Sequence, residues 1–241
     1  MKFKLQNTLD YLYPAVCHFC NCKLNDSGYL CEICTDNLPQ VQPPFCSKCG
    51  ECYDGAIDGP FYCPNCTQLK LHFDFAVAAY QDTEKSLNLI HDFKYNRQIH
   101  LSRDIARLTT EALSDPRFSP YLQDAFLIPV PLHWRRYSWR QFNQSEEIAQ
   151  QIAKTQPELT SMNVLKRDRH TKTQTSFSRA MRLKNLHGAF SIRKKYQHNI
   201  KNKHIILIDD VFTTGSTANE CSKTLLLAGA KNVAILTFLR G

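Results

Sequence analysis

Eight cysteines near the start of the chain are spaced as metal ligands. They form four Cys-x2-Cys pairs: Cys17 and Cys20, Cys31 and Cys34, Cys46 and Cys49, and Cys63 and Cys66. Each pair presents its two thiolates to one side of a tight turn, and two pairs complete the tetrahedral S4 coordination that structural Zn(II) favours. The sequence therefore predicts two structural zinc sites. Pairing in chain order and cross-braced pairing are both compatible with this spacing, and we expect the neighbouring Cys22 and Cys52 to be free.

The alternative for these cysteines is a disulfide framework, which requires an oxidising compartment. The apolar run at residues 12–16 is short and interrupted by Pro14, so it does not resemble the core of a signal peptide. No stretch of 18 consecutive apolar residues occurs, so we expect no membrane insertion. We therefore expect a cytoplasmic protein in which zinc, rather than disulfides, stabilises the N-terminal region.

An acidic pair and a hydroxyl-rich turn form a second chemical centre. Asp209 and Asp210 directly follow residues 205–208, an apolar run with the composition of a buried strand. The turn that follows, and the start of the next predicted helix, contain Thr213, Thr214, Gly215, Ser216 and Thr217. Hydroxyls and backbone N–H groups at a helix N-terminus bind phosphate, and Gly215 permits the tight turn that directs them inward. The pattern predicts a sugar-phosphate site, and the alternative is a plain capped helix start with solvated carboxylates.

Predicted strands and helices alternate from residue 73 onward. The patterns predict strands at 75–80, 125–130, 164–165, 205–208 and 233–239, and helices at 86–93, 101–113, 145–154 and 216–228. This alternation predicts an α/β fold with a mainly parallel sheet and helices on both faces. We expect two domains, a small double zinc ribbon at 1–72 and the α/β domain at 73–241. Ligands of such sheets bind at the carboxyl ends of the strands, which is where the acidic pair lies.

The 241-residue chain carries a formal charge of +8, which is concentrated in its middle. Residues 133–204 contain 16 Lys and Arg against 4 Asp and Glu, whereas residues 1–72 contain 5 against 7. This asymmetry favours a polyanionic partner for the middle of the chain. It also favours a structural or protein-contact role, rather than a DNA-binding one, for the zinc-ribbon region.

Residues 133–142 combine arginines with aromatic rings, as surfaces that bind single-stranded nucleic acid do. Packing of the two tryptophans in the core is the alternative. A second basic stretch lies at 166–184, between predicted elements, and could contact DNA or pyrophosphate. The side chains that we assign to DNA or pyrophosphate are Trp134, Arg135, Arg136, Arg140, Lys172 and Arg182.

The segment 205–217 resembles the phosphoribosyl-pyrophosphate (PRPP) motif of type I phosphoribosyltransferases. Together with the cysteine pairs and the run Arg140-Gln-Phe-Asn-Gln-Ser145, it makes almost the whole chain similar to the competence protein F (ComF) family. The chain departs from that family at Gln141, where glycine is usual. We expect a side chain at this position to hinder close approach of an anion to the backbone.

The resemblance implies a role in natural transformation, with single-stranded DNA handled in the cytoplasm and contacts to DNA-import or recombination proteins. It implies that Asp209 and Asp210 contact the ribose hydroxyls of PRPP, directly or through Mg2+, and are the catalytic residues of any transfer. Residues 213–217 would then hold the 5′-phosphate. Two other functions stay open, namely an active phosphoribosyltransferase of nucleotide metabolism and a regulatory module that senses PRPP.

Overall fold

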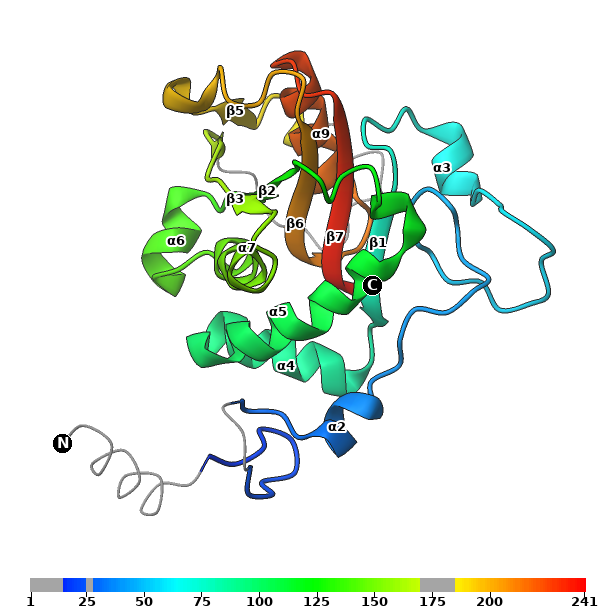
Figure 1. Ribbon diagram of the computed structural model, residues 1–241, viewed down its shortest axis with the longest axis vertical. Helices are drawn as coiled ribbons and strands as arrows, with labels where there is room; N and C mark the ends of the chain where they lie inside the picture. Colours follow the sequence, from blue (N-terminus) through cyan, green and yellow to red (C-terminus); the bar gives the residue numbers. More distant parts are fainter. Residues whose placement is uncertain (1–14, 25–27, 170–184) are drawn as a thin grey trace.

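The computed structural model describes residues 15–24, 28–169 and 185–241 of the chain. A five-stranded parallel sheet in the order β1-β7-β6-β2-β3 forms its centre (Figure 1). The strands are β1 (Ala76–Gln81), β2 (Phe126–Pro129), β3 (Thr160–Ser161), β6 (His204–Phe212) and β7 (Asn232–Arg240). This topology confirms the predicted α/β fold with a mainly parallel sheet.

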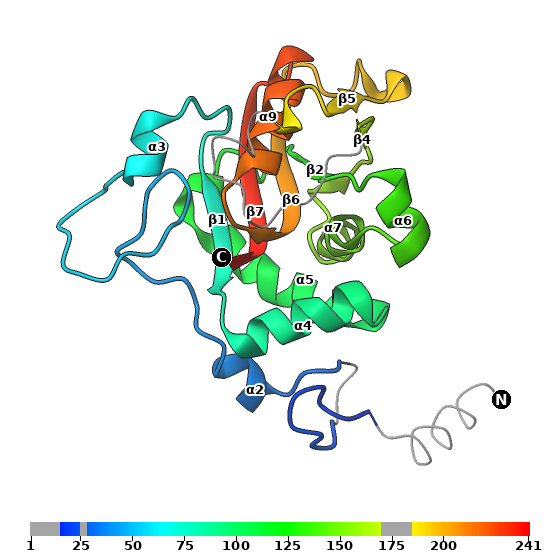
Figure 2. The ribbon, with the colours of Figure 1, turned by 180° about the vertical axis from the view of Figure 1, so that it is seen from behind.

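Helices cover both faces of the sheet, so the central strands are apolar on both sides. One face packs on α4 (Glu84–Tyr95), α5 (Ser102–Glu111) and α7 (Gln144–Thr155), and its core includes Ile206 and Ile208. The other face carries α9 (Ser216–Leu227) and a core that includes Ile205 and Leu207 (Figure 2). Alternate residues of β6 therefore belong to different cores, which is why residues 205–208 of this strand are all apolar.

Three details differ from the sequence-based expectation. Strand β6 continues to Phe212, so the acidic pair lies within the strand rather than after it. Strand β4 (Leu165–Arg167) does not join the main sheet, because it pairs in antiparallel fashion with β5 (Phe190–Ile192). The helix α6 (Trp134–Arg140) was not expected, since several of its large side chains are exposed and leave no apolar periodicity.

The cysteine-rich segments attach to two different parts of the α/β fold. The first, which includes α2 (Glu32–Asp36), lies beside α4, and the second, which includes α3 (Pro64–Gln68), flanks β1 (Figure 1). The Tyr29 N–H donates to Asp104 Oδ2 of α5 at 2.9 Å, and the Ala76 N–H of β1 donates to the Lys48 carbonyl at 2.9 Å. Within the described residues, no helix is long and apolar enough to cross a membrane.

Candidate functional site

The cysteine sulfurs gather in two groups. The sulfurs of the second group lie within 4.8 Å of one another and belong to Cys46, Cys49, Cys63 and Cys66. The sulfurs of the first group meet the same limit and belong to Cys17, Cys20, Cys22 and Cys31. The first Cys-x2-Cys pair therefore faces the second, and the third faces the fourth, which is pairing in chain order and not cross-bracing. Four thiolates at this separation fit one structural zinc ion in each group.

Cys22, which we expected to be free, belongs to the first group. The Cys17 N–H donates to the Cys22 carbonyl at 2.8 Å, and this tight turn brings the Cys22 side chain toward the others. The Cys34 thiol, which we predicted as a ligand, also interacts with the thiols of Cys31 and Cys20. Five thiols therefore surround a site that needs four.

This surplus predicts that Cys22 and Cys34 substitute for each other as the fourth ligand. Cys22→Ser and Cys34→Ser should each retain two zinc ions per chain, because the remaining thiol completes the site. The double variant should retain one ion per chain, as measured by chelator release and elemental analysis. Cys52→Ser is the matched control and should retain two ions. Loss of one zinc ion in either single variant would contradict the prediction that Cys22 and Cys34 can replace each other as the fourth ligand.

The turn between β6 and α9 is built to expose backbone N–H groups. Gly215 has φ +71°, and a Cβ at this position would come within 2.5 Å of the Phe212 ring, so only glycine fits. Among the described residues no side chain caps the first turn of α9, which leaves its N–H groups to bind an anion. The Thr214 and Ser216 hydroxyls lie 3.0 Å apart, and Thr213 is exposed.

The two neighbouring aspartates differ in their partners. Asp210 is buried, and its Oδ2 lies 2.9 Å from Lys94 Nζ of α4. Asp209 Oδ1 accepts hydrogen bonds from the Ser145 hydroxyl and the Asp210 N–H, both at 3.0 Å. Burial, followed by the charge of Asp210, raises the pKa of Asp209 to about 7. Asp210 is therefore neutralised by an internal ion pair, whereas Asp209 is a titratable group.

The predicted DNA or pyrophosphate residues separate into outward-facing and buried groups. Trp134 and Trp139 of α6 are 63% and 56% exposed, so packing of the tryptophans in the core is wrong. Arg135 is exposed and lies 5.3 Å above the Trp134 ring. Arg140 is buried against the Tyr95 ring at 4.9 Å. Arg136 is half-buried, and Lys172 and Arg182 lie outside the described residues.

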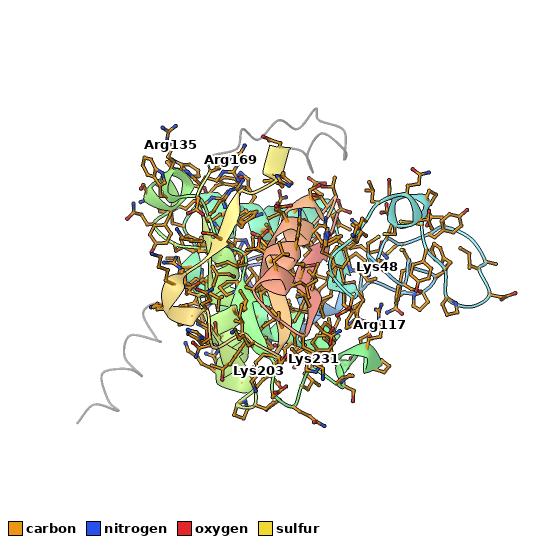
Figure 3. All side chains as sticks on the ribbon, turned by 90° about the horizontal axis from the view of Figure 1, so that it is seen from above. Lys48, Arg117, Arg135, Arg169, Lys203 and Lys231 are labelled. Atoms are coloured by element: carbon orange, nitrogen blue, oxygen red, sulfur yellow. The ribbon has the colours of Figure 1, made fainter. Side chains whose placement is uncertain are left out.

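Residues from α4 and the loop that follows it extend this aromatic surface. The ring of Tyr95 lies 5.6 Å from that of Trp139, and Arg97 donates to the Trp139 carbonyl at 3.0 Å. We name the surface the α6 patch, and it consists of Trp134, Arg135, Tyr137, Trp139, Tyr95 and Arg97. In the view of Figure 3, Arg135 and Arg169 project at one end of the molecule, opposite Lys203 and Lys231. Tyr95 and Arg97 were not predicted for this surface, because they precede α6 by some 40 residues in the sequence.

Known proteins resemble the chain over most of its length. Competence protein F of Haemophilus influenzae is 31% identical over 223 residues, which are 88% of this chain and 97% of that protein. The chain belongs to the competence protein F family. The DNA utilization protein YhgH of Salmonella typhimurium is 30% identical over 230 residues, 94% of this chain and 97% of its own.

Two further likenesses cover parts of this ComF-family chain. Residues 8–67 match the double zinc ribbon domain, which includes both cysteine groups. A hypoxanthine phosphoribosyltransferase from Staphylococcus aureus is 18% identical with a TM-score of 0.34, over 58% of this chain and 64% of that one.

The backbone at Gln141 accounts for the glycine that is usual in the ComF family. Gln141 ends α6 in the left-handed region at φ +69°, and its N–H donates to the Tyr137 carbonyl at 2.6 Å. Glycine is favoured at such a position because a Cβ is strained there. This conformational requirement favours glycine at position 141 independently of the effect on anion approach, which stays a prediction.

Replacing Gln141 with glycine should stabilise the protein. Removal of the left-handed strain is worth about 1 kcal/mol, which corresponds to a rise in Tm of about 2–4 °C for a chain of this size. Thermal unfolding measures the effect. Gln156→Gly is the matched control at the end of α7, where φ is −122°, and it should lower Tm. A Gln141→Gly variant that melts at or below the wild-type temperature would count against the strain.

Proposed function

We propose that this ComF-family protein handles single-stranded DNA during natural transformation, as the strand enters the cytoplasm. We further propose that it binds PRPP or a related phosphosugar at the β6–α9 turn. The names of the relatives, competence protein F and DNA utilization protein, support a DNA-related role. The α6 patch is the observation that carries the DNA part of the proposal.

The α6 patch has the chemistry of a stacking platform for bases. Two indole rings and the Tyr137 ring are exposed on a helix of seven residues. Large aromatic rings in water are costly to leave uncovered, and every base offers a π-face that stacks on them. Arg135 beside Trp134 supplies a cation for the phosphates, whereas a duplex would hide its base faces from the rings.

The β6–α9 turn and Asp209 support the phosphosugar part. The N–H groups at the start of α9 would hold the 5′-phosphate, with the hydroxyls of Thr213 and Thr214 beside them. Asp209 would accept hydrogen bonds from the ribose hydroxyls, directly or through Mg2+, once it is ionised. Asp210 would hold Lys94 in place rather than bind the sugar, because its Oδ2 is occupied by that ion pair.

Arg136 and Arg167 are half-buried arginines that suit the pyrophosphate. Burial, followed by the charge of Arg136, lowers the pKa of Arg167, and the negative charge of Asp209 opposes that shift. Burial, followed by the charge of Arg140, also lowers the pKa of Arg136. A bound anion would add a favourable charge interaction with these guanidinium groups. We therefore assign Arg136 to the anion side of the site and Arg135 to the DNA.

Two binding measurements on the full-length zinc protein test the proposal. Calorimetric titration with Mg-PRPP should give saturable binding, and a fluorescent single strand should bind with a steep dependence on salt. Binding of the single strand without release of pyrophosphate favours DNA handling. Pyrophosphate release with an added base would instead favour the metabolic transferase. Absence of single-strand binding at low salt would refute the DNA part, and PRPP binding alone would then favour a sensor.

A further inference from the structure

The penultimate residue of the chain joins the second cysteine group to the β6–α9 turn. Arg240 is 7% exposed, and its Nη1 donates to the carbonyls of Phe212 and Thr213 at 2.9 and 3.1 Å. Its Nη2 lies 2.5 Å from Oε2 of Glu51. One guanidinium therefore contacts the backbone of the proposed phosphate-binding turn and a carboxylate of the cysteine-rich region.

On the side of the turn, Arg240 also contacts the ring that sets the position of Gly215. The guanidinium lies over the Phe212 ring at 5.5 Å from its centroid. The same ring occupies the space where a Cβ of residue 215 would lie, so Gly215 packs directly against it. The two carbonyl contacts and the ring contact together fix the exit of β6, from which the first N–H groups of α9 are directed.

On the other side, Glu51 belongs to the loop that carries two ligands of the second group. Its carbonyl accepts a hydrogen bond from the Cys46 N–H at 2.8 Å, and it follows Cys49 by two residues. A zinc ion bound by these thiolates would hold this loop, and so the carboxylate, in place. Among the described residues, Glu51 is the acidic side chain within salt-bridge distance of Arg240.

The first cysteine group has a different set of contacts. His18 pairs with Asp92 at 3.0 Å, and Lys85 donates to the Cys34 carbonyl at 3.2 Å, both on α4. None of these side chains contacts the β6–α9 turn, although α4 also carries Lys94, the partner of Asp210 in β6. The first cysteine group is therefore attached to α4, whereas the second is connected to the β6–α9 turn through Glu51 and Arg240.

We propose that the second zinc site, through Glu51 and Arg240, positions the β6–α9 turn for its anionic ligand. Arg240 is a positioning residue, because it contacts the backbone of the turn and not the ligand. Loss of the Glu51 charge leaves the buried guanidinium of Arg240 without this carboxylate partner. Arg240 then holds the carbonyls of Phe212 and Thr213 less firmly. The ligand side of this inference rests on the proposed phosphosugar function, whereas the coupling within the protein does not.

Hydrogen exchange of the zinc-loaded, ligand-free protein tests the coupling directly. Glu51→Gln keeps the size of the side chain and removes its charge. It should speed exchange of the Asn219 and Gly241 amides, which donate to the carbonyls of Gly215 and Phe212 at 2.8 and 3.0 Å, about tenfold. Amides of β2 should be unchanged, which a general loss of stability would not allow. Glu32→Gln is the matched control, since Glu32 follows Cys31 of the first group, and it should change neither region. Unchanged exchange of the Asn219 and Gly241 amides in Glu51→Gln would overturn the inference.

Conservative variants separate positioning from a general structural effect. Glu51→Asp restores the charge and should restore most of the protection of the Asn219 and Gly241 amides. Arg240→Lys keeps a charge but lacks the planar fork that serves two carbonyls and a carboxylate, so it should behave like Glu51→Gln. Equal exchange in Glu51→Asp and Glu51→Gln would show that the charge is irrelevant and would overturn the inference.

A titration with Mg-PRPP distinguishes this inference from the proposed function. If the wild type binds, Glu51→Gln should weaken binding about tenfold, while Glu32→Gln binds as the wild type does. Equal binding by wild type and Glu51→Gln would overturn the inference and leave the proposed function standing. Absence of binding by the wild type would overturn the phosphosugar proposal, and the exchange measurement would still decide the coupling.

Discussion

Replacing Asp209 with asparagine should weaken Mg-PRPP binding by at least about 100-fold and, at the same time, make the protein more stable above pH 7. The binding loss follows because an amide cannot replace the charged acceptor for ribose hydroxyls or the ligand for Mg2+. Calorimetric titration at pH 8 measures it. Unchanged affinity in Asp209→Asn would remove Asp209 from the proposed site.

The gain in stability depends on pH in a defined direction. The pKa of Asp209 is about 7 in the folded protein, against an ordinary value of about 3.9 in an unfolded chain. Between these values the folded state holds a proton that the unfolded state has lost, so stability falls as the pH rises from about 4 to about 7. Asparagine removes this penalty, and its effect on Tm should be larger at pH 8 than at pH 5.

Asp210→Asn is the control for this experiment, because it should have the opposite effect on stability. The variant leaves the Lys94 ammonium group, which is largely buried, without its partner at 2.9 Å. Breaking a buried pair on one side costs about 3 kcal/mol, so Tm should fall at pH 8. If Asp209→Asn and Asp210→Asn change Tm in the same direction, the result would contradict the prediction that the ion pair with Lys94 makes Asp210 stabilising while Asp209 is destabilising.

Removing both tryptophans of α6 should weaken single-strand binding by about 100-fold. Each stacked base contributes about 1–3 kcal/mol in such surfaces, and Trp134 and Trp139 are the largest exposed rings of the α6 patch. Anisotropy of a labelled oligonucleotide measures the effect for the Trp134→Ala/Trp139→Ala variant. Its matched control is Tyr53→Ala/Tyr62→Ala, which removes two exposed rings of the cysteine-rich region and should bind normally. Equal loss in both double variants would assign the effect to something other than the α6 patch.

The arginines around the patch should separate by their salt dependence. Arg135 is exposed, so Arg135→Ala should reduce the slope of log affinity against log salt by about 1. Arg140 is buried against Tyr95, and Arg140→Ala should leave that slope unchanged. The tryptophan variants should lower the affinity with the slope preserved, because stacking releases no counterions. A slope that falls with Arg140→Ala but not with Arg135→Ala would contradict the orientation of the two side chains.

Several features of the protein were determined by the local sequence alone. Cys-x2-Cys pairs, a strand of four apolar residues and a Gly-containing turn are each formed by neighbouring residues, so their chemistry is visible before folding. The parallel sheet was also predictable, because strands that alternate with helices have few other ways to bury their apolar faces. The family likeness follows from these same motifs and is supported by 31% identity to competence protein F.

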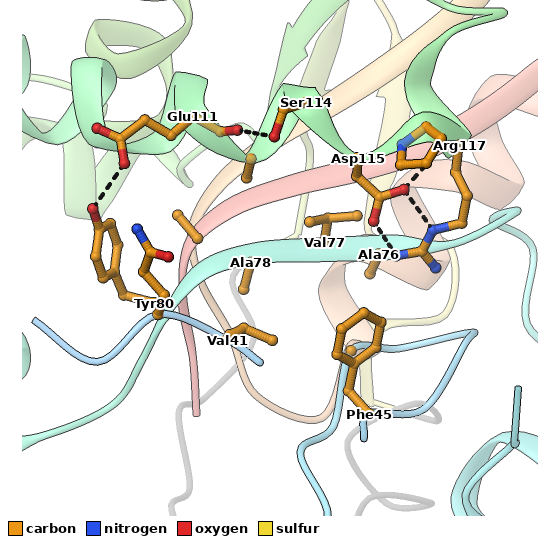
Figure 4. A pocket seen from close by; sticks show the side chains of 15 residues that line it. Val41, Phe45, Ala76, Val77, Ala78, Tyr80, Glu111, Ser114, Asp115 and Arg117 are labelled. Atoms are coloured by element: carbon orange, nitrogen blue, oxygen red, sulfur yellow. Dashed lines mark hydrogen bonds and ion pairs between the residues drawn. The ribbon is translucent and has the colours of Figure 1, made fainter. Parts of the chain in front are cut away.

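The cavities of the molecule illustrate what local patterns do not show. The pocket of about 420 Å3 in Figure 4 lies between β1 and residues 40–50, and Glu111 and Arg117 also line it. It forms because residues 42–47 leave the edge of β1 between the Val41 contact to Ala79 and the Lys48 contact to Ala76. Such a gap depends on two segments that meet only in the folded chain.

The partners of the proposed site residues were decided by tertiary structure. Lys94 reaches Asp210 from α4, Tyr95 extends the surface of Trp139, and Arg240 reaches Glu51 from the end of the chain. Each pair joins residues far apart in the sequence, and helix and strand periodicity carries no information about which distant side chains will meet. The sequence alone thus specified the groups that carry the chemistry. Packing decided which of them are neutralised, exposed or held in place, because burial and charge pairing exist only once the segments come together.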